Sequence, residues 1–434
     1  MLKYFKSRIS DTNPLRLLFH KMRAVAAALY YGFPSRRLHV IAVTGTKGKT
    51  TTVNLVTAIL QEAGYKVGMA STIFFQIGDS RWANTTKSTT IGPFALQKML
   101  REMVNANCTY AVIEVTSHAL TQNRIWGINV DTAVLTNVGE DHLDYHGGFE
   151  SYLRTKGLLF SRLNRSSRKP RIQKISVLNR DDSNFTYFDQ FLADKKYTYG
   201  FNAGTCFVTD MFLTPGGSNF VMHVPNNSAE INLKLPGAFN VYNALAAGTV
   251  ALANNINLTV VKTALEKSSS IPGRLEAIDC GQKYSIIVDF AHTEESLDQV
   301  LSLYRGLTKK KLFVVFGATG GGRDKGKRPK MGAVADKLAD YIILTDDDPY
   351  EEDESQIIED ISAGIKRKEG ENFWKIPHRE EAIKLALNLA REGDTVIIAG
   401  KGAEEVQMIG GGAIEWDDRK VVRALLSRAV RVEV

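Results

Sequence analysis

Cysteine is scarce in this chain: Cys108, Cys206 and Cys280 are the only three among 434 residues, and they are far apart. Without a Cys-x-x-Cys pair, neither a thiolate zinc site nor a disulfide framework is expected. Long uninterrupted apolar runs are lacking too, which argues against a membrane-spanning helix. No small-residue cleavage site follows an apolar segment near the N-terminus, so a signal peptide is not expected. These absences favour a reducing, cytoplasmic setting.

An excess of positive over negative charge is scarce outside the N-terminus. The formal net charge is +8, yet the first 38 residues carry eight basic side chains against Asp11 alone. A basic excess confined to one end gives little support for nucleic-acid binding. This leader, residues 1–38, is also rich in leucine and aromatic residues. We interpret it as an amphipathic helix that packs on the protein body. The alternatives are a helix on an anionic membrane surface, or an element that docks on a partner or an anionic substrate.

The alternation of short β-branched runs with helical stretches predicts an α/β fold with a mostly parallel sheet. Strands are expected at 39–43, 111–115, 132–136, 175–178, 285–290, 312–316, 341–345 and 395–399. Helices are expected at 50–63 and 240–254, and a polar loop at 161–174. Residues 196–235 are expected to form either an antiparallel insertion or a mixed-sheet extension. Small polar residues and Pro-Gly at 268–273 indicate a boundary. The predicted organisation is the leader 1–38, a central domain 39–271 and a Rossmann-like C-terminal domain 272–434.

The strongest motif is a glycine-rich loop at residues 45–50, between a predicted strand and a predicted helix. Glycines let the backbone wrap around phosphates, and a helix N-terminus favours an anion. In such a P-loop, Lys49 reaches the terminal phosphates of ATP and Thr50 ligates Mg²⁺. The match is to a variant, because a strict Walker A motif has glycine where this chain has Val43. We expect the central domain to bind ATP through Gly45, Thr46, Lys47, Gly48, Lys49, Thr50 and Thr51.

This loop resembles the start of the ATP domain of the Mur ligase family, which joins a carboxylate to an amine through an acyl-phosphate. The stretches Glu114–Leu120 and Thr136–His146 are similar to family signatures, the second to that of the muramyl-tripeptide synthetases. The resemblance implies that Glu114 binds Mg²⁺ and that His142 ligates a second Mg²⁺. It also implies that Lys156 is carbamylated, which turns a cation into a metal-binding anion. The alternative for His142 is a hydrogen-bonded structural histidine, and the alternative for Lys156 is a surface lysine.

The resemblance also assigns contacts to the nucleotide and the substrates. Arg274 in a Pro-Gly-Arg-x-Glu stretch, and Asp289 and His292 in a Val-Asp-x-Ala-His-Thr stretch, are implied nucleotide contacts. So are Asn240 and Asn243, although Asn240 can also be read as a helix N-cap. Arg323 is implied to hold the carboxylate of the incoming amino acid, and Lys327 to approach the γ-phosphate. The remaining implied substrate contacts are Thr89, Thr90, Thr116, Ser117, Arg124, Asp347, Asp348 and Glu404.

Three departures from the family concern specificity. Members that add diaminopimelate carry Asp-Asn-Pro-Arg where this chain has residues 347–350 with Tyr350 last, followed by several acidic residues. These acidic residues either form a solvated loop without a specific role or make the site prefer a cationic amino acid such as lysine. The family's Gly-Lys-Gly-His-Glu stretch corresponds to residues 400–404 here. Glu404 is kept as a candidate contact of the amino acid's amine end, but Ala403 replaces the histidine. Only the leader precedes the glycine-rich loop, at the place where the family has a UDP-binding domain. The expected acceptor is therefore either a UDP-muramyl-peptide that is bound without that domain or an acceptor without UDP, such as a lipid-linked one.

We therefore predict an ATP- and Mg²⁺-dependent amide ligase that adds an amino acid to a muramyl-peptide-like acceptor in peptidoglycan precursor synthesis. Its expected partners are small molecules, with membrane contact through the leader as an option. The predicted catalytic residues are Lys49, Glu114, His142, Lys156 and Arg274. Two alternatives stay open: another amide ligase of this fold, of the folylpolyglutamate or cyanophycin type, and a nucleotide-binding scaffold without catalysis.

Overall fold

The computed structural model describes residues 13–86, 88–141, 143–214, 216–268, 272–322 and 324–430. The predicted site residues His142 and Arg323 lie outside these ranges, as do the first 12 residues of the leader. The chain divides into two compact units. Unit 1 comprises Met1–Leu213 with Gly217–Ser269, and unit 2 comprises Thr214–Gly216 with Ser270–Val434.

Unit 1 is built on an eight-stranded sheet with the order β4-β3-β2-β5-β1-β6-β7-β8. Its strands are β1 (His39–Thr44), β2 (Val67–Ala70), β3 (Phe74–Ile77), β4 (Ser80–Ala83), β5 (Tyr110–Glu114), β6 (Thr132–Leu135), β7 (Ile175–Asn179) and β8 (Lys195–Tyr199). Within this order, every pair of neighbouring strands from β2 to β8 is parallel. Strand β3 pairs antiparallel with both β2 and β4. The carboxyl ends of the parallel strands meet at one edge, where α/β proteins bind ligands.

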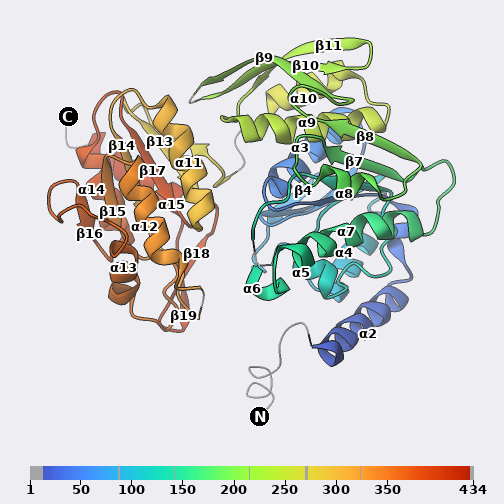
Figure 1. Ribbon diagram of the computed structural model, residues 1–434, viewed down its shortest axis with the longest axis horizontal. Coiled ribbons are helices and arrows are strands. Elements are labelled where there is room, and N and C mark those ends of the chain that lie inside the picture. Colours follow the sequence, from blue (N-terminus) through green and yellow to red (C-terminus); the bar gives the residue numbers. More distant parts are fainter. Residues whose placement is uncertain are drawn as a thin grey trace. The chain divides into compact units, whose positions relative to one another are not determined.

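Helices cover both faces of this sheet because successive residues of a strand point to opposite sides. Ile41 and Val43 of β1 belong to one buried cluster, and Val40 and Ala42 belong to the other. The first face carries α3 (Lys49–Glu62), α9 (Ala238–Ala253) and α10 (Leu258–Lys267), and the second carries α4 (Pro93–Asn105), α5 (Ser117–Thr121), α7 (Phe149–Arg165) and α8 (Phe185–Asp189), as Figure 1 shows. The two layers of helices confirm the predicted α/β class.

Three further features of unit 1 lie outside the main sheet. A separate three-stranded sheet contains β9 (Phe207–Thr214), β10 (Gly217–Val224) and β11 (Asn227–Leu233), and β10 pairs antiparallel with β11. The insertion predicted for 196–235 is therefore confirmed only for its later part, because residues 196–199 belong to β8, which pairs in parallel with β7. The short α6 (Leu143–His146) precedes α7. The leader forms α2 (Pro14–Tyr30), which packs on α4 through buried alanines, and a 3-10 turn, η1 (Pro34–Arg37). The predicted loop at 161–174 is wrong at its start, because α7 continues to Arg165 and buries Leu163 one turn after Leu159 and Phe160.

Unit 2 is a second α/β layer structure. Its sheet has the order β12-β13-β17-β14-β15-β16, and every pairing is parallel except that of β12. The elements are β12 (Glu276–Ala277), β13 (Ser285–Asp289), β14 (Leu312–Phe316), β15 (Tyr341–Leu344), β16 (Phe373–Lys375), β17 (Thr395–Ala399), α11 (Glu294–Leu307), α12 (Lys327–Leu338), α13 (Glu354–Ser362), α14 (Arg379–Leu389), α15 (Asp418–Val430) and the hairpin β18 (Val406–Ile409) and β19 (Gly412–Glu415). No helix within the described ranges is both long and apolar enough to cross a membrane.

Candidate active site

The glycine-rich loop joins β1 to α3 at the ligand-binding edge of unit 1. Gly45 and Gly48 have positive φ angles of 152° and 79°, a region that side chains rarely adopt. A Cβ atom on Gly45 would lie 1.8 Å from Oγ1 of Thr136, and one on Gly48 would lie 2.2 Å from Oδ1 of Asn243. Both the turn and the close approach of its neighbours therefore require glycine.

Replacing Gly48 by alanine is expected to lower ATP-dependent phosphate release about 100-fold. The new methyl group would push against Asn243, and alanine at this φ adds about 1 kcal/mol of backbone strain. Gly64→Ala is the matched control, because Gly64 also has a positive φ of 85° but nothing lies within 4 Å of the place where its Cβ atom would be. Phosphate release and thermal unfolding are measured for both variants, which separates backbone strain at the glycine from displacement of Asn243. Equal losses of activity in the two variants would contradict the prediction.

Two lysine side chains meet at the loop. Nζ of Lys49 donates to the carbonyl oxygens of Gly45 and Thr46, at 3.0 and 2.7 Å. Nζ of Lys156, from α7, donates to the same Gly45 oxygen at 2.7 Å. Lys156 is 1% exposed, so it is not a surface lysine. Burial, and then the charge of Lys49, hold the pKa of Lys156 well below its ordinary value. A lowered pKa favours the neutral, nucleophilic form of the amine, which fits carbamylation.

Asn137, two residues after the end of β6, contacts the other side of the loop. Its backbone oxygen accepts from the Thr46 amide at 2.8 Å, and its Oδ1 accepts from the Lys47 amide at 3.0 Å. Its Nδ2 donates to the Lys47 carbonyl at 3.1 Å. These three bonds fix the backbone around the anion site. The sequence did not single out Asn137, although its place at a strand end beside a predicted P-loop is a usable signal.

Glu114 ends β5 with a carboxylate that is 2% exposed. Thr50 Oγ1 donates to it at 3.1 and 3.2 Å, and the backbone amide of Thr72 donates at 2.9 Å. A hydroxyl and a carboxylate that converge in this way form the oxygen-rich donor set that Mg²⁺ prefers. The residues therefore fit the implied metal. Thr72 was missed, because only the fold brings this residue, which follows β2, beside Glu114.

The implied acceptor contacts lie along one wall beside Glu114. Thr72 Oγ1 donates to Thr89 Oγ1 at 3.0 Å. The Thr90 hydroxyl donates to the Glu114 carbonyl at 2.8 Å and accepts from the Thr116 amide at 3.1 Å. Arg124 donates to the Thr90 carbonyl at 2.5 Å. Thr116 caps α5, whose first residue, Ser117, is buried. The structure thus brings these five implied contacts to the sheet edge where Glu114 lies.

The two asparagines of α9 lie on the opposite side of the loop. Nδ2 of Asn243 donates to Oδ1 of Asn240 at 3.1 Å, and Thr52 of α3 donates to Oδ1 of Asn243 at 3.3 Å. The interpretation of Asn240 as a helix N-cap is wrong: Gly237 is the N-cap, and Asn240 lies in the first turn. Its Nδ2 donates to the Pro236 carbonyl instead, at 2.8 Å.

In unit 2 the implied nucleotide contacts cluster at the end of β13. Asp289 is buried and accepts from the amides of Leu275 and Ala291 at 2.7 and 2.8 Å. Burial raises its pKa, although the Arg274 charge and these amides oppose the rise. Burial lowers the pKa of His292 to about 4, so its imidazole is neutral at pH 7. Lys327 donates to the His292 carbonyl at 2.9 Å. Lys327 therefore places a cation close to a neutral ring.

Arg274 lies in the same cluster. Its guanidinium carbon is 4.7 Å from the centre of the Phe290 ring. Its buried Nε has no hydrogen-bond partner among the described residues. A buried donor without a partner is costly, and a bound anion would supply one. The side chain is thus suited to the phosphate contact that the resemblance implies.

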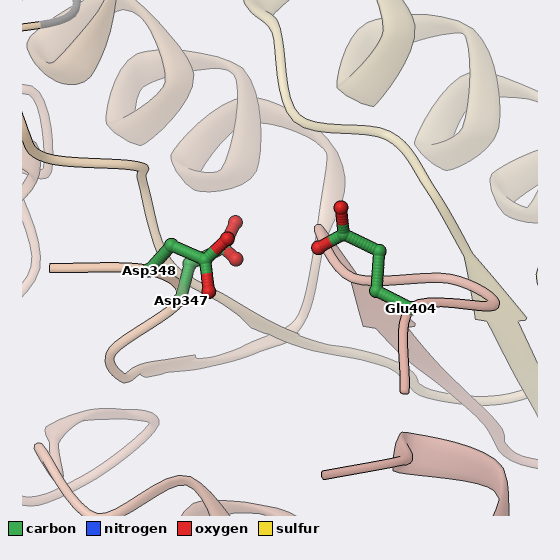
Figure 2. A group of neighbouring side chains, drawn as sticks. All are labelled: Asp347, Asp348 and Glu404. Atoms are coloured by element: carbon green, nitrogen blue, oxygen red, sulfur yellow. The ribbon is translucent and has the colours of Figure 1, made fainter. Parts of the chain in front are cut away.

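Three further implied substrate residues, Asp347, Asp348 and Glu404, form one acidic cluster, and Figure 2 shows their carboxylates facing a common space. Their oxygens lie within 4.8 Å of one another. Lys401 offsets part of the cluster's negative charge, with Nζ 2.8 Å from Asp348, 2.9 Å from Glu404 and 3.5 Å from Asp347. These carboxylates raise its pKa above the ordinary value, against the effect of burial. Because an ammonium already sits among them, a metal is disfavoured, and Glu404 is the least buried member. Lys401 was missed as a site residue.

Family models match both units. The Mur ligase middle domain matches residues 43–251, and the Mur ligase glutamate ligase domain matches residues 273–402. A UDP-N-acetylmuramoyl-L-alanyl-D-glutamate--2,6-diaminopimelate ligase of Geobacillus kaustophilus is 44% identical over 423 residues, covering 96% of this chain and 85% of the relative. A UDP-N-acetylmuramyl-tripeptide synthetase of Roseiflexus sp. is 39% identical over 415 residues, covering 93% and 81%.

Solved structures agree with these relatives. A UDP-N-acetylmuramoyl-L-alanyl-D-glutamate--2,6-diaminopimelate ligase structure is 33% identical with a TM-score of 0.65, covering 91% of this chain and 79% of that one. The folylpolyglutamate synthase of Mycobacterium tuberculosis has a TM-score of 0.68 at 17% identity and covers 94% of each chain. At that identity the likeness concerns the fold alone.

Proposed function

Because the chain belongs to the Mur ligase family, we propose a particular form of that family's reaction for it. It is an ATP-dependent, ADP-forming amide ligase of peptidoglycan precursor synthesis. We propose UDP-N-acetylmuramoyl-L-alanyl-D-glutamate, the acceptor in the names of its relatives, as its acceptor. One observation carries the catalytic assignment: Lys49, Lys156 and the Thr50–Glu114 pair converge on one strand-end edge.

The proposed chemistry begins with two anions. The acceptor carboxylate attacks the γ-phosphorus of ATP, ADP leaves, and an acyl-phosphate forms. Lys49 offsets the repulsion and stabilises the transferring phosphoryl group, and Arg274 is the proposed second cation. Thr50 and Glu114 would hold one Mg²⁺, and His142 with a carbamylated Lys156 would hold a second; these ions would supply further charge neutralisation.

The second step forms the amide. The amine nitrogen of the incoming amino acid attacks the acyl carbon, phosphate leaves, and the nitrogen loses a proton. We propose that Arg323 holds the carboxylate of the amino acid, since a guanidinium binds a carboxylate through two parallel hydrogen bonds. Glu404, the least buried carboxylate beside Lys401, is the proposed contact of the amine end. Asp347 and Asp348 are proposed to support it through Lys401.

We propose lysine, rather than diaminopimelate, as the added amino acid. Diaminopimelate carries a second carboxylate, and Tyr350 stands where the family's diaminopimelate-adding members have an arginine for it. The cavity beside Tyr350 has a volume of about 610 Å³ and is lined by Gly321, Gly322, Tyr350, Glu351, Glu352, Met408 and Gly411. Two of these described lining residues are acidic and none is basic. Glu352 already pairs with Lys325 and Arg328, at 2.7 and 2.8 Å, so the acidic character of the lining rests on Glu351. A carboxylate at this position disfavours a second carboxylate on the substrate and favours an ammonium.

Phosphate release tests the proposed function. With ATP, the UDP-dipeptide acceptor, bicarbonate and a panel of amino acids, we expect release that requires the acceptor and L-lysine. We expect kcat/KM for lysine to be about tenfold or more above that for diaminopimelate. Tyr350→Arg should narrow or reverse this preference, because it restores a cation beside the cavity. Release with diaminopimelate alone would contradict the lysine proposal, and no release with any amino acid would contradict the proposed acceptor.

A further inference from the structure

Helix α2 has two apolar faces, of which only one is packed. Ala24, Ala27 and Ala28 are buried on the side that contacts α4. The other side exposes large apolar residues: Leu15, Leu18, Phe19, Met22 and Leu29. Their spacings of three, four and seven residues place them along one stripe of the helix. Phe19 is 57% exposed and Leu29 is 63% exposed, so this stripe lacks a partner within the described chain.

Basic residues border the stripe. At helical spacing, Arg16 and Arg23 fall on one side of it and Lys21 on the other. The 3-10 turn that follows adds the exposed Arg36 and Arg37. Residues 13–38 carry these five basic side chains and no acidic one. Long basic side chains can lay their apolar stems along such a stripe and extend their charges to its margins.

We propose that α2 lies flat on an anionic lipid bilayer, with the stripe among the acyl chains and the basic margins at the phosphate headgroups. This combination of an apolar face and flanking cations is the pattern of helices that bind in the membrane interface. A second copy of the chain fits poorly, because pairing two stripes would bring their cationic margins together. Figure 1 shows α2 at the edge of unit 1, below α4. The proposal goes beyond the ligase reaction, because it places the enzyme on a membrane surface.

Vesicle flotation of the full chain tests this inference. We expect binding to vesicles of phosphatidylglycerol and phosphatidylcholine, weak binding to pure phosphatidylcholine, and a loss of binding as salt rises. A variant with Lys21→Gln and Arg23→Gln should bind the anionic vesicles about 25-fold more weakly, since each basic side chain near such a surface contributes about fivefold. Equal binding to neutral and anionic vesicles, or no effect of this variant, would overturn the proposal.

The apolar stripe has its own matched pair of variants. Leu18→Glu with Phe19→Glu should abolish flotation, because two charges would enter the acyl region. Leu192→Glu with Phe212→Glu is the control, since these side chains are 70% and 65% exposed elsewhere in unit 1. Both variants should keep the thermal unfolding midpoint and the phosphate release of the parent. Equal flotation of the two variants would overturn the proposal. So would a dimer in lipid-free solution that only the first variant dissociates.

Discussion

Replacing Lys156 by alanine is expected to lower ATP-dependent phosphate release by about a thousandfold while the protein stays folded. The side chain is buried, and its amine contacts the Gly45 carbonyl at 2.7 Å. Lys49 still donates to that oxygen in the variant, so the carbonyl keeps a partner. The expected loss is therefore chemical: with the lysine gone, no carbamate can form to hold the second metal.

The pH dependence has a defined sign. Burial and Lys49 lower the pKa of Lys156, so its neutral amine is present at a lower pH than that of an ordinary lysine. In the proposed carbamylation, the neutral amine attacks carbon dioxide, a C–N bond forms and the nitrogen loses a proton, which gives the carbamate. As the pH falls through the lowered pKa, the amine becomes protonated and the carbamate is lost. We expect activity to fall on the acid side, and bicarbonate to restore part of it.

A ¹³C NMR spectrum with labelled bicarbonate measures the modification directly. A carbamate signal is expected for the parent and not for Lys156→Ala. Lys169→Ala is the control, because Lys169 is also a buried lysine with a lowered pKa but is paired with Asp131. It should lose stability, since Asp131 loses one of its two lysine partners, yet keep the signal and the activity. A signal that survives in Lys156→Ala would refute the assignment.

Much of the fold could be predicted because its signals are local. Buried parallel strands are short β-branched runs, and residues 39–43 and 395–399 lie within β1 and β17. The end of α7 escaped prediction, because Arg162 and Arg165 mask the apolar periodicity that Leu163 continues. Asn240 was misread as an N-cap because the sequence is equally compatible with two helix starts. One is capped by the Asn240 side chain, and the other begins after Gly237, three residues earlier.

The site was predictable only where a motif is contiguous. The glycine loop and Glu114 are marked by their own neighbours in the sequence. Thr72, Asn137 and Lys401 gain their roles from residues that are distant along the chain. Thr72, for instance, lies 42 positions before the carboxylate it contacts. The burial of Lys156 also escaped prediction, because a lysine is ordinarily exposed. A signal was present, since Tyr152, Leu153, Leu159 and Phe160 at helical spacing place Lys156 on the buried face of α7.

Replacing Lys49 by alanine is expected to reduce phosphate release by about a thousandfold and to abolish the thermal stabilisation by ATP. Its ammonium is held at the loop by the carbonyls of Gly45 and Thr46, where it can neutralise the phosphates that the loop wraps. Lys49→Arg keeps the charge but changes its shape, so it should lose less activity.

The same variant separates the two lysines. The charge of Lys49 contributes to the lowered pKa of Lys156, but burial is the larger cause. Lys49→Ala should therefore keep the carbamate signal while it loses ATP binding, whereas Lys156→Ala should lose the signal and keep the stabilisation by ATP. If both variants lost both properties, Lys49 and Lys156 would act only as one structural unit that orders the loop, and the division into a phosphate-binding lysine and a metal-binding carbamate would be wrong.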